Sequence, residues 1–123
     1  MKTNYILDHV NKKKNKSTKI TRTVLADFGY AALSIGTFNL SDDINNYTKI
    51  EIYTECGNGL RYFGQYTPEQ CLATTSIKYF VAYRSDNDYS SIYFPSSTSV
   101  YVSTYDSYQY ANVKVIGIKI EES

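Results

Sequence analysis

The chain has 123 residues and a net charge of +1, with 42% apolar and 20% charged residues. This length suits one domain that buries its own core without a metal or a disulfide, and it is too short for a TIM barrel or a two-lobed enzyme. With His9 as its one histidine the chain offers almost nothing to His-dependent triads or zinc sites, and 14 of its 19 aromatic residues are tyrosine.

Residues 1–20 form a basic segment in front of a mildly acidic remainder. They hold six Lys against one Asp, a charge of +5, whereas residues 21–123 hold seven basic and eleven acidic residues, a charge of −4. We therefore expect a flexible or docking arm over 1–20 and a folded domain over 21–123. The candidate anchoring residues are Lys12, Lys13, Lys14, Lys16 and Lys19.

Such an arm is typical of a solvated tail, of a contact with an acidic partner or of a contact with nucleic acid. The run KKKNK lacks the interleaved aromatic residues of a specific nucleic-acid reader, so no specific nucleic-acid partner is expected. The only apolar run near the N-terminus, Tyr5–Leu7, is too short for a signal peptide, and no stretch of 18 apolar residues exists. We expect synthesis in a cytoplasm and no membrane insertion.

From residue 22 onward the chain reads as short strands separated by turn residues. The predicted strands are Thr23–Phe28, Leu33–Leu40, Tyr47–Cys56, Leu60–Tyr66, Ser76–Arg84, Ser91–Phe94, Ser99–Tyr105 and Val113–Ile120. Gly36 is expected to mark a bulge or a close backbone approach, and Gly117 an interruption of the last strand. About eight strands with no amphipathic helix predict an all-β fold, an antiparallel β-sandwich or jelly roll.

The segment Tyr47–Cys56 has the clearest period of two. Ile50, Ile52, Thr54 and Cys56 fall on one face, and Lys49, Glu51, Tyr53 and Glu55 on the other. This alternation predicts one buried and one solvated face. Cys56 and Cys71 are expected to be small buried thiols, since a cytosol is reducing. The alternative is a disulfide between them that closes a 15-residue loop.

One helical turn is expected after the fourth strand. Thr67 and Gln70 have the spacing of a capping box, and Pro68 occupies the first helical position.

The carboxylates do not form a convincing catalytic or metal site. Glu51 and Glu55 share a strand face, but four residues at about 3.3 Å each place their Cα atoms roughly 13 Å apart, beyond the separation of glycosidase pairs. The pairs Asp42–Asp43 and Asp86–Asp88 are better interpreted as turn and cap residues. We therefore predict no catalytic residue, no metal, no cofactor and no enzymatic activity.

The tyrosines of the C-terminal half are the candidate binding residues. Tyr side chains among Ser, Asn and Asp suit recognition of a protein or a sugar, since each offers a rigid ring and a hydroxyl. The alternative is cross-strand packing on a half-wet sheet face, which we favour for Tyr79 and Tyr83. The candidates for an interface or binding surface are Tyr89, Tyr93, Tyr101, Tyr105, Tyr108 and Tyr110.

Three segments carry a resemblance to a known family: TVLADFGYAALSIGTFNL, NNYTKIEIYTECGNG and NVKVIGIKI. Over residues 23–120 the chain resembles the small β-sandwich head domains of bacteriophage and prophage tail, baseplate or head fibre proteins. The matching positions are Tyr47, Ile50, Ile52, Tyr53, Val115, Gly117, Ile118 and Lys119. The resemblance implies a non-enzymatic virion protein, commonly a homotrimer, that contacts other virion proteins or a host-surface glycan or protein.

Fibre heads usually follow a long trimeric shaft, whereas here a basic arm precedes the domain. This departure raises the alternative of a capsid-bound decoration or head fibre protein that its arm anchors. A free-standing glycan-binding module is a further alternative, and it would show a shallow cleft lined by tyrosine rings. A small hydrolase would need carboxylates that converge in a pocket.

Overall fold

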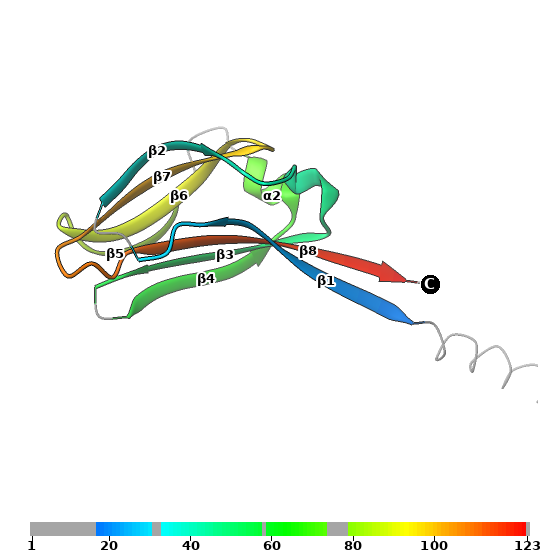
Figure 1. Ribbon diagram of the computed structural model, residues 1–123, viewed down its shortest axis with the longest axis horizontal. Helices are drawn as coiled ribbons and strands as arrows, with labels where there is room; N and C mark the ends of the chain where they lie inside the picture. The colour runs from blue at the N-terminus through cyan, green and yellow to red at the C-terminus, as the bar shows by residue number, and fades with distance from the viewer. Residues whose placement is uncertain (1–16, 31–32, 58, 74–78, 123) are drawn as a thin grey trace, which may run out of the picture.

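The computed structural model describes residues 17–30, 33–57, 59–73 and 79–122. Over these residues the chain forms eight strands with very little helix (Figure 1). In chain order the elements are β1 (Thr18–Asp27), β2 (Leu33–Asn39), the 3-10 turn η1 (Ile44–Asn46), β3 (Lys49–Cys56), β4 (Leu60–Tyr66), α2 (Pro68–Leu72), β5 (Phe80–Ser85), β6 (Asp88–Ser96), β7 (Ser99–Asp106) and β8 (Asn112–Glu122). The predicted all-β class is confirmed.

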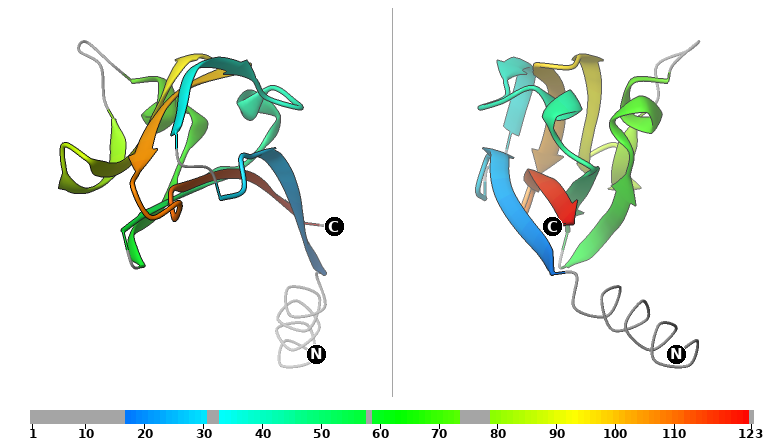
Figure 2. Two further views of the ribbon diagram at one scale, coloured as in Figure 1. Left: turned by 60° about the vertical axis from the view of Figure 1, so that its left-hand side comes forward. Right: turned by 90° about the vertical axis from the view of Figure 1, so that its right-hand side faces the viewer.

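The strands form two four-stranded sheets that pack face to face as two layers (Figure 2). Sheet A has the order β1-β8-β3-β4 and sheet B the order β2-β7-β6-β5, and every neighbouring pair is antiparallel. β1 pairs with β8 and β2 pairs with β7. The first two strands of the chain thus pair with the last two in reverse order, as in a jelly roll. The inner strands pair instead as the hairpins β3–β4 and β5–β6. The result is an antiparallel sandwich with jelly-roll-like outer pairs.

The core lies between the sheets and is built from alternate side chains of each strand. The central members are Ile50, Ile52, Phe80, Ile92, Val100, Val102, Val113 and Val115, all nearly inaccessible to solvent. Burying one such side chain contributes about 1.5–3 kcal/mol. The period of two over Tyr47–Cys56 therefore identified the core face of β3 correctly, because Ile50, Ile52, Thr54 and Cys56 are all fully buried.

β1 begins earlier than the sequence suggests, at Thr18 instead of Thr23. Its first residues pair with the end of β8, from Thr18 opposite Glu122 to Arg22 opposite Ile118. Figure 1 shows this two-stranded ribbon running away from the rest of the sandwich. The expected boundary at residue 20 thus falls inside β1. Of the candidate anchors, Lys19 lies exposed on β1, and Lys12, Lys13, Lys14 and Lys16 lie outside the described residues.

Gly36 in β2 and Gly117 in β8 do not interrupt the strands that contain them. β2 keeps one register with β7 on both sides of Gly36, so the expected bulge is absent there, although the φ of this residue is +145°. Gly117 pairs regularly with Thr23 and Ile50. A Cβ at Gly117 would lie 2.5 Å from the Tyr47 ring, so a glycine is needed to let that ring lie against the sheet.

α2 is the single helical turn that the sequence predicts, with a complete capping box. The Gln70 backbone N–H donates to the Thr67 hydroxyl over 3.1 Å, and the Thr67 N–H donates to the Gln70 side-chain oxygen over 2.9 Å. The helix buries Cys71.

Cys56 and Cys71 are both buried and are not joined by a disulfide. The Cys56 thiol donates to the Ala82 carbonyl over 3.2 Å, and burial raises the pKa of this thiol. The interpretation of both cysteines as buried thiols agrees with the structure.

Candidate functional site

Four of the six candidate tyrosines lie on the outer face of sheet B, the face that points away from the core. On β7 the core side chains are Val100, Val102 and Thr104, so the intervening Tyr101 and Tyr105 point outward. Tyr93 and Tyr89 lie directly opposite them on β6. The structure therefore brings these four residues together on one surface.

Three rows that cross the four strands make up most of the outer face of sheet B. Tyrosine fills most of the two outer rows, which are Tyr83–Tyr89–Tyr105–Leu33 and Tyr79–Tyr93–Tyr101–Thr37. The middle row has smaller side chains on the two central strands, in the order Val81–Ser91–Ser103–Ile35. We call these twelve residues the tyrosine face. Successive rows are two residues, or about 7 Å, apart, so two tyrosine ridges border a shallower middle row.

Ring contacts fix the side chains of one ridge. The rings of Tyr79 and Tyr93 meet edge to face with centroids 5.1 Å apart, and Tyr93 and Tyr101 are also 5.1 Å apart. Such contacts hold the rings in defined orientations. Tyr79 thus packs across strands, as expected, and Tyr83 lies opposite Tyr89 on β6. Both lie on the same exposed surface as the candidate binding residues.

A hollow of about 400 Å³ lies at the β5 end of the tyrosine face, where it is lined by Tyr79, Val81, Tyr83, Asp86, Tyr89 and Ser91. The Tyr83 hydroxyl donates to the Asp86 carboxylate over 2.8 Å, and this hydrogen bond raises the pKa of Tyr83. Asp86 stands in the β5–β6 turn, at the rim of the surface. None of the twelve residues of the tyrosine face is charged.

Tyr108 and Tyr110 do not belong to this face. They lie exposed in the connection between β7 and β8. The buried Asp106 carboxylate holds this connection, because it accepts the backbone N–H groups of Tyr108 and of Gly57 in the β3–β4 turn. The six candidate tyrosines therefore separate into a group of four on the sheet and a pair in a turn.

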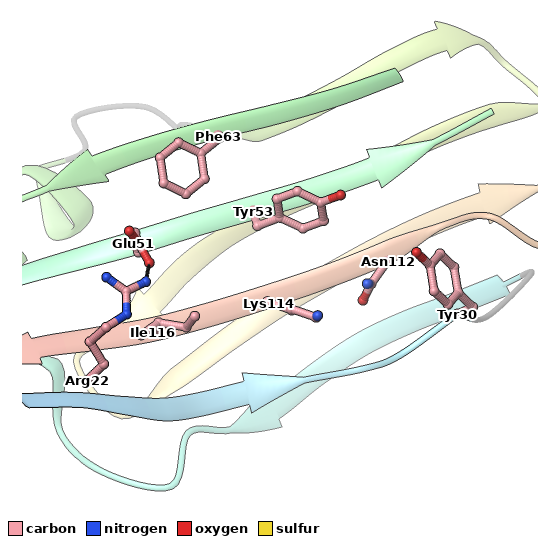
Figure 3. A pocket seen from close by; sticks show the side chains of 8 residues that line it. All are labelled: Arg22, Tyr30, Glu51, Tyr53, Phe63, Asn112, Lys114 and Ile116. Carbon is pink, nitrogen blue, oxygen red and sulfur yellow. Dashed lines mark hydrogen bonds and ion pairs between the residues drawn. The ribbon is translucent and has the colours of Figure 1, made fainter. Parts of the chain in front are cut away.

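The outer face of sheet A carries a polar site that the sequence did not reveal. Glu51 and Glu55, predicted to be solvated, are only 6% and 7% exposed. Arg22 on β1 forms an ion pair with Glu51, and Gln65 on β4 donates to the same carboxylate over 2.9 Å. Arg22 thus reaches the Glu51 carboxylate from the β1 side (Figure 3), and Gln65 reaches it from β4.

Between these side chains lies a hollow of about 230 Å³, which we call the sheet A pocket. Its lining residues are Arg22, Tyr30, Glu51, Tyr53, Phe63, Asn112, Lys114 and Ile116. Figure 3 shows the Lys114 ammonium and the Asn112 amide pointing toward one another between Tyr53 and Tyr30. Asn112 is 3% exposed, and its side-chain oxygen has no hydrogen-bond partner among the described residues.

Two phenols that line this pocket, those of Tyr53 and Tyr30, also interact with the buried Glu55 carboxylate. The Tyr53 hydroxyl donates to Glu55 over 2.5 Å. Burial is the larger cause and this hydrogen bond the next of a rise in the pKa of Tyr53 to about 12. A hydrogen bond to the same carboxylate raises the pKa of Tyr30. The one sequence signal for the pocket was Tyr53, an aromatic residue on the strand face that was predicted to be solvated.

Asp42 and Asp43 act as turn and cap residues, as the sequence predicts, and Asp86 lies in the β5–β6 turn, whereas Asp88 lies on β6 and its carboxylate binds the β7–β8 connection. Asp43 caps η1 by accepting the Asn45 backbone N–H over 2.8 Å. Asp42 accepts hydrogen bonds from Tyr47 and Asn46, and the Tyr47 bond contributes most to lowering its pKa. Asp88 accepts the backbone N–H and the hydroxyl of Ser107.

Within the described residues, no group of three or more His, Cys, Asp or Glu side chains could hold a metal ion. In that part of the chain no helix has the length and hydropathy that a membrane span requires. Comparisons of the chain with protein-family models, with curated proteins and with solved structures find no match.

Proposed function

We propose that this chain is a non-enzymatic contact domain of a bacteriophage particle, and that copies of it associate through the tyrosine face. The observation that carries the proposal is that face itself, which holds six tyrosines and three aliphatic residues and no charge. Tyrosine is enriched and charged residues are depleted at the cores of protein interfaces. A large exposed apolar patch on a small domain marks an interaction site.

A second copy of the chain is the occupant that this chemistry fits best. Copies that meet through an uncharged surface bury no unpaired charge and create no like-charge repulsion. The ridges and the shallower middle row differ in height, so one part of the face can pack against a different part of it on the next copy, as a closed trimer requires. The homotrimer and the virion location rest on the resemblance of residues 23–120 to fibre head domains.

In this proposal the basic arm docks the domain on the particle through its lysines, and the sandwich projects outward to contact other virion proteins or the host surface. Decoration of the capsid surface is the alternative location. Both locations use the same two contacts, because a basic arm suits an acidic surface and the tyrosine face suits association between copies.

Sedimentation velocity of matched variants tests the proposed assembly surface. Tyr83 on the tyrosine face and Tyr108 in the β7–β8 connection are almost equally exposed, at 57% and 59%. We expect the wild type and Tyr108→Glu to sediment as trimers, and Tyr83→Glu as a monomer with an unchanged circular dichroism spectrum. A wild type that stays monomeric at high concentration, or two variants that behave alike, would contradict the proposal.

Attachment to a glycan is a second candidate function, favoured by the hollow that Tyr79, Tyr83 and Tyr89 line. Aromatic rings beside hydroxyl and carboxylate groups are suited to sugar rings. Its test is a glycan array. Binding by a monomeric wild type, lost in Tyr89→Ala and retained in Tyr108→Ala, would support this function over assembly.

A further inference from the structure

The side-chain oxygen of Asn112 is a buried hydrogen-bond acceptor without a partner among the described residues. The residue is 3% exposed. Buried polar atoms are nearly always hydrogen-bonded, so an exception requires an explanation. Asn112 lines the sheet A pocket. A ligand with a hydroxyl or amine donor in that pocket would supply the missing partner.

The Lys114 ammonium is a positive charge in the same pocket that has no acidic partner among the described residues. Glu51 is already engaged by Arg22 and Gln65. Asp27 lies opposite Lys114 in the β1–β8 register, but its carboxylate accepts the Gly29 backbone N–H, and Lys114 forms no ion pair with a described residue. An anionic group on a ligand would therefore meet an available ammonium.

Aromatic rings flank these two polar groups. Phe63, directly opposite Tyr53 across the β3–β4 ladder, is largely exposed, and Tyr30 closes the other side (Figure 3). Exposed rings of this kind stack on flat ring faces made of C–H groups. The volume of about 230 Å³ lies below the usual range for drug-sized ligands, so it suits one small ring.

We propose that the sheet A pocket binds a sugar acid, a single six-membered sugar ring that carries a carboxylate. The carboxylate pairs with the Lys114 ammonium, a ring hydroxyl donates to the Asn112 side-chain oxygen, and the C–H face of the ring packs against Tyr53 and Phe63. This site lies on the opposite sheet from the tyrosine face, so the proposal is independent of the assembly that the tyrosine face supports.

The test is an NMR titration of the full chain with D-glucuronate, with D-glucose and acetate as comparators. We expect glucuronate to shift the side-chain amide signals of Asn112 and the backbone signals around Lys114. We expect glucose to bind at least about tenfold more weakly, because it lacks the charged hydrogen bond. Lys114→Met should remove the preference for glucuronate, whereas Lys119→Met, on the same strand outside the pocket, should keep it.

A second variant separates a ligand-binding Asn112 from a structural one. Asn112→Leu keeps the approximate size of the side chain and removes its amide, so the Tm should stay unchanged or rise while glucuronate binding is lost. A drop in Tm, or binding that survives in Asn112→Leu, would overturn the assignment. So would an absence of shifts at the pocket with glucuronate, or equal affinities for glucuronate and glucose in the wild type.

Discussion

Tyr53 shows how a side chain on the outer face of a sheet can acquire the chemistry of a buried group. Its hydroxyl donates to Glu55 over 2.5 Å, and Glu55 is itself almost inaccessible. Desolvation and the neighbouring carboxylate both disfavour the phenolate, so the pKa of Tyr53 rises to about 12. The neutral phenol is therefore part of what holds this face together.

We expect Tyr53 to contribute stability that disappears at high pH. A tyrosine in the unfolded chain ionises near pH 10, and the folded pKa lies at about 12. The contribution is complete below about pH 10 and is lost as the pH rises toward about 12, because the unfolded chain releases its proton first. Urea unfolding of the wild type and Tyr53→Phe across this range measures the difference. A Tyr53 that titrates near pH 10 in ring-labelled NMR spectra would contradict it.

At the scale of single residues, the sequence predicts local roles better than distant ones. The cap formed by Asp43 needs only the two residues that follow it. The burial of Glu51 depends on Arg22, which lies 29 residues away and reaches it across β8. The period of two on β3 identified which face carries Glu51, but it contains no information about what covers that face.

At the scale of elements, α2 was predictable because its determinants lie within four residues. Thr67, Pro68 and Gln70 together fix the position at which the helix begins. β1 is the opposite case. Its first half, TKITR, has little apolar character, and it is a strand because β8 pairs with it from Thr18 onward. Only a partner strand a hundred residues later in the chain could have indicated this start.

The capping box leads to a prediction for α2. Thr67→Ala removes the acceptor of the Gln70 backbone N–H and should lower the free energy of unfolding by about 1 kcal/mol. Thr67→Ser keeps the hydroxyl and should retain most of the stability. Urea denaturation of both variants measures this difference. Equal losses in the two would mean that the threonine methyl group, and not the cap, stabilises the turn.

At the scale of the whole molecule, the strand order determines which tyrosines act together. Tyr83, Tyr89 and Tyr105 come from three strands and meet in one row only because sheet B has the order β2-β7-β6-β5. The sequence singled out Tyr89 and Tyr105 but assigned Tyr83 to packing and grouped Tyr108 with the contact residues. Strand periodicity defines faces within a strand, whereas a surface is made by neighbours across strands.

The two proposed contacts of the molecule should differ in their sensitivity to salt. The tyrosine face is uncharged, whereas residues 1–20 carry a charge of +5. The Debye length falls from about 10 Å at 0.1 M salt to about 3 Å at 1 M, which weakens contacts between exposed charges and leaves apolar ones intact. We therefore expect the trimer to persist at 1 M NaCl, and binding of the chain to a polyglutamate-coated surface to be lost there.

Deleting residues 1–17 provides the control, since it removes four of the five candidate anchoring lysines and leaves β1 complete from Thr18. The shortened chain should form the same trimer in sedimentation equilibrium and should bind polyglutamate weakly at any salt concentration. A trimer that dissociates at 1 M NaCl would show that charged groups hold the copies together. The tyrosine face has no charged residue, so this result would contradict its proposed role. Strong polyglutamate binding by the shortened chain would show that the sandwich, and not the arm, binds the acidic surface.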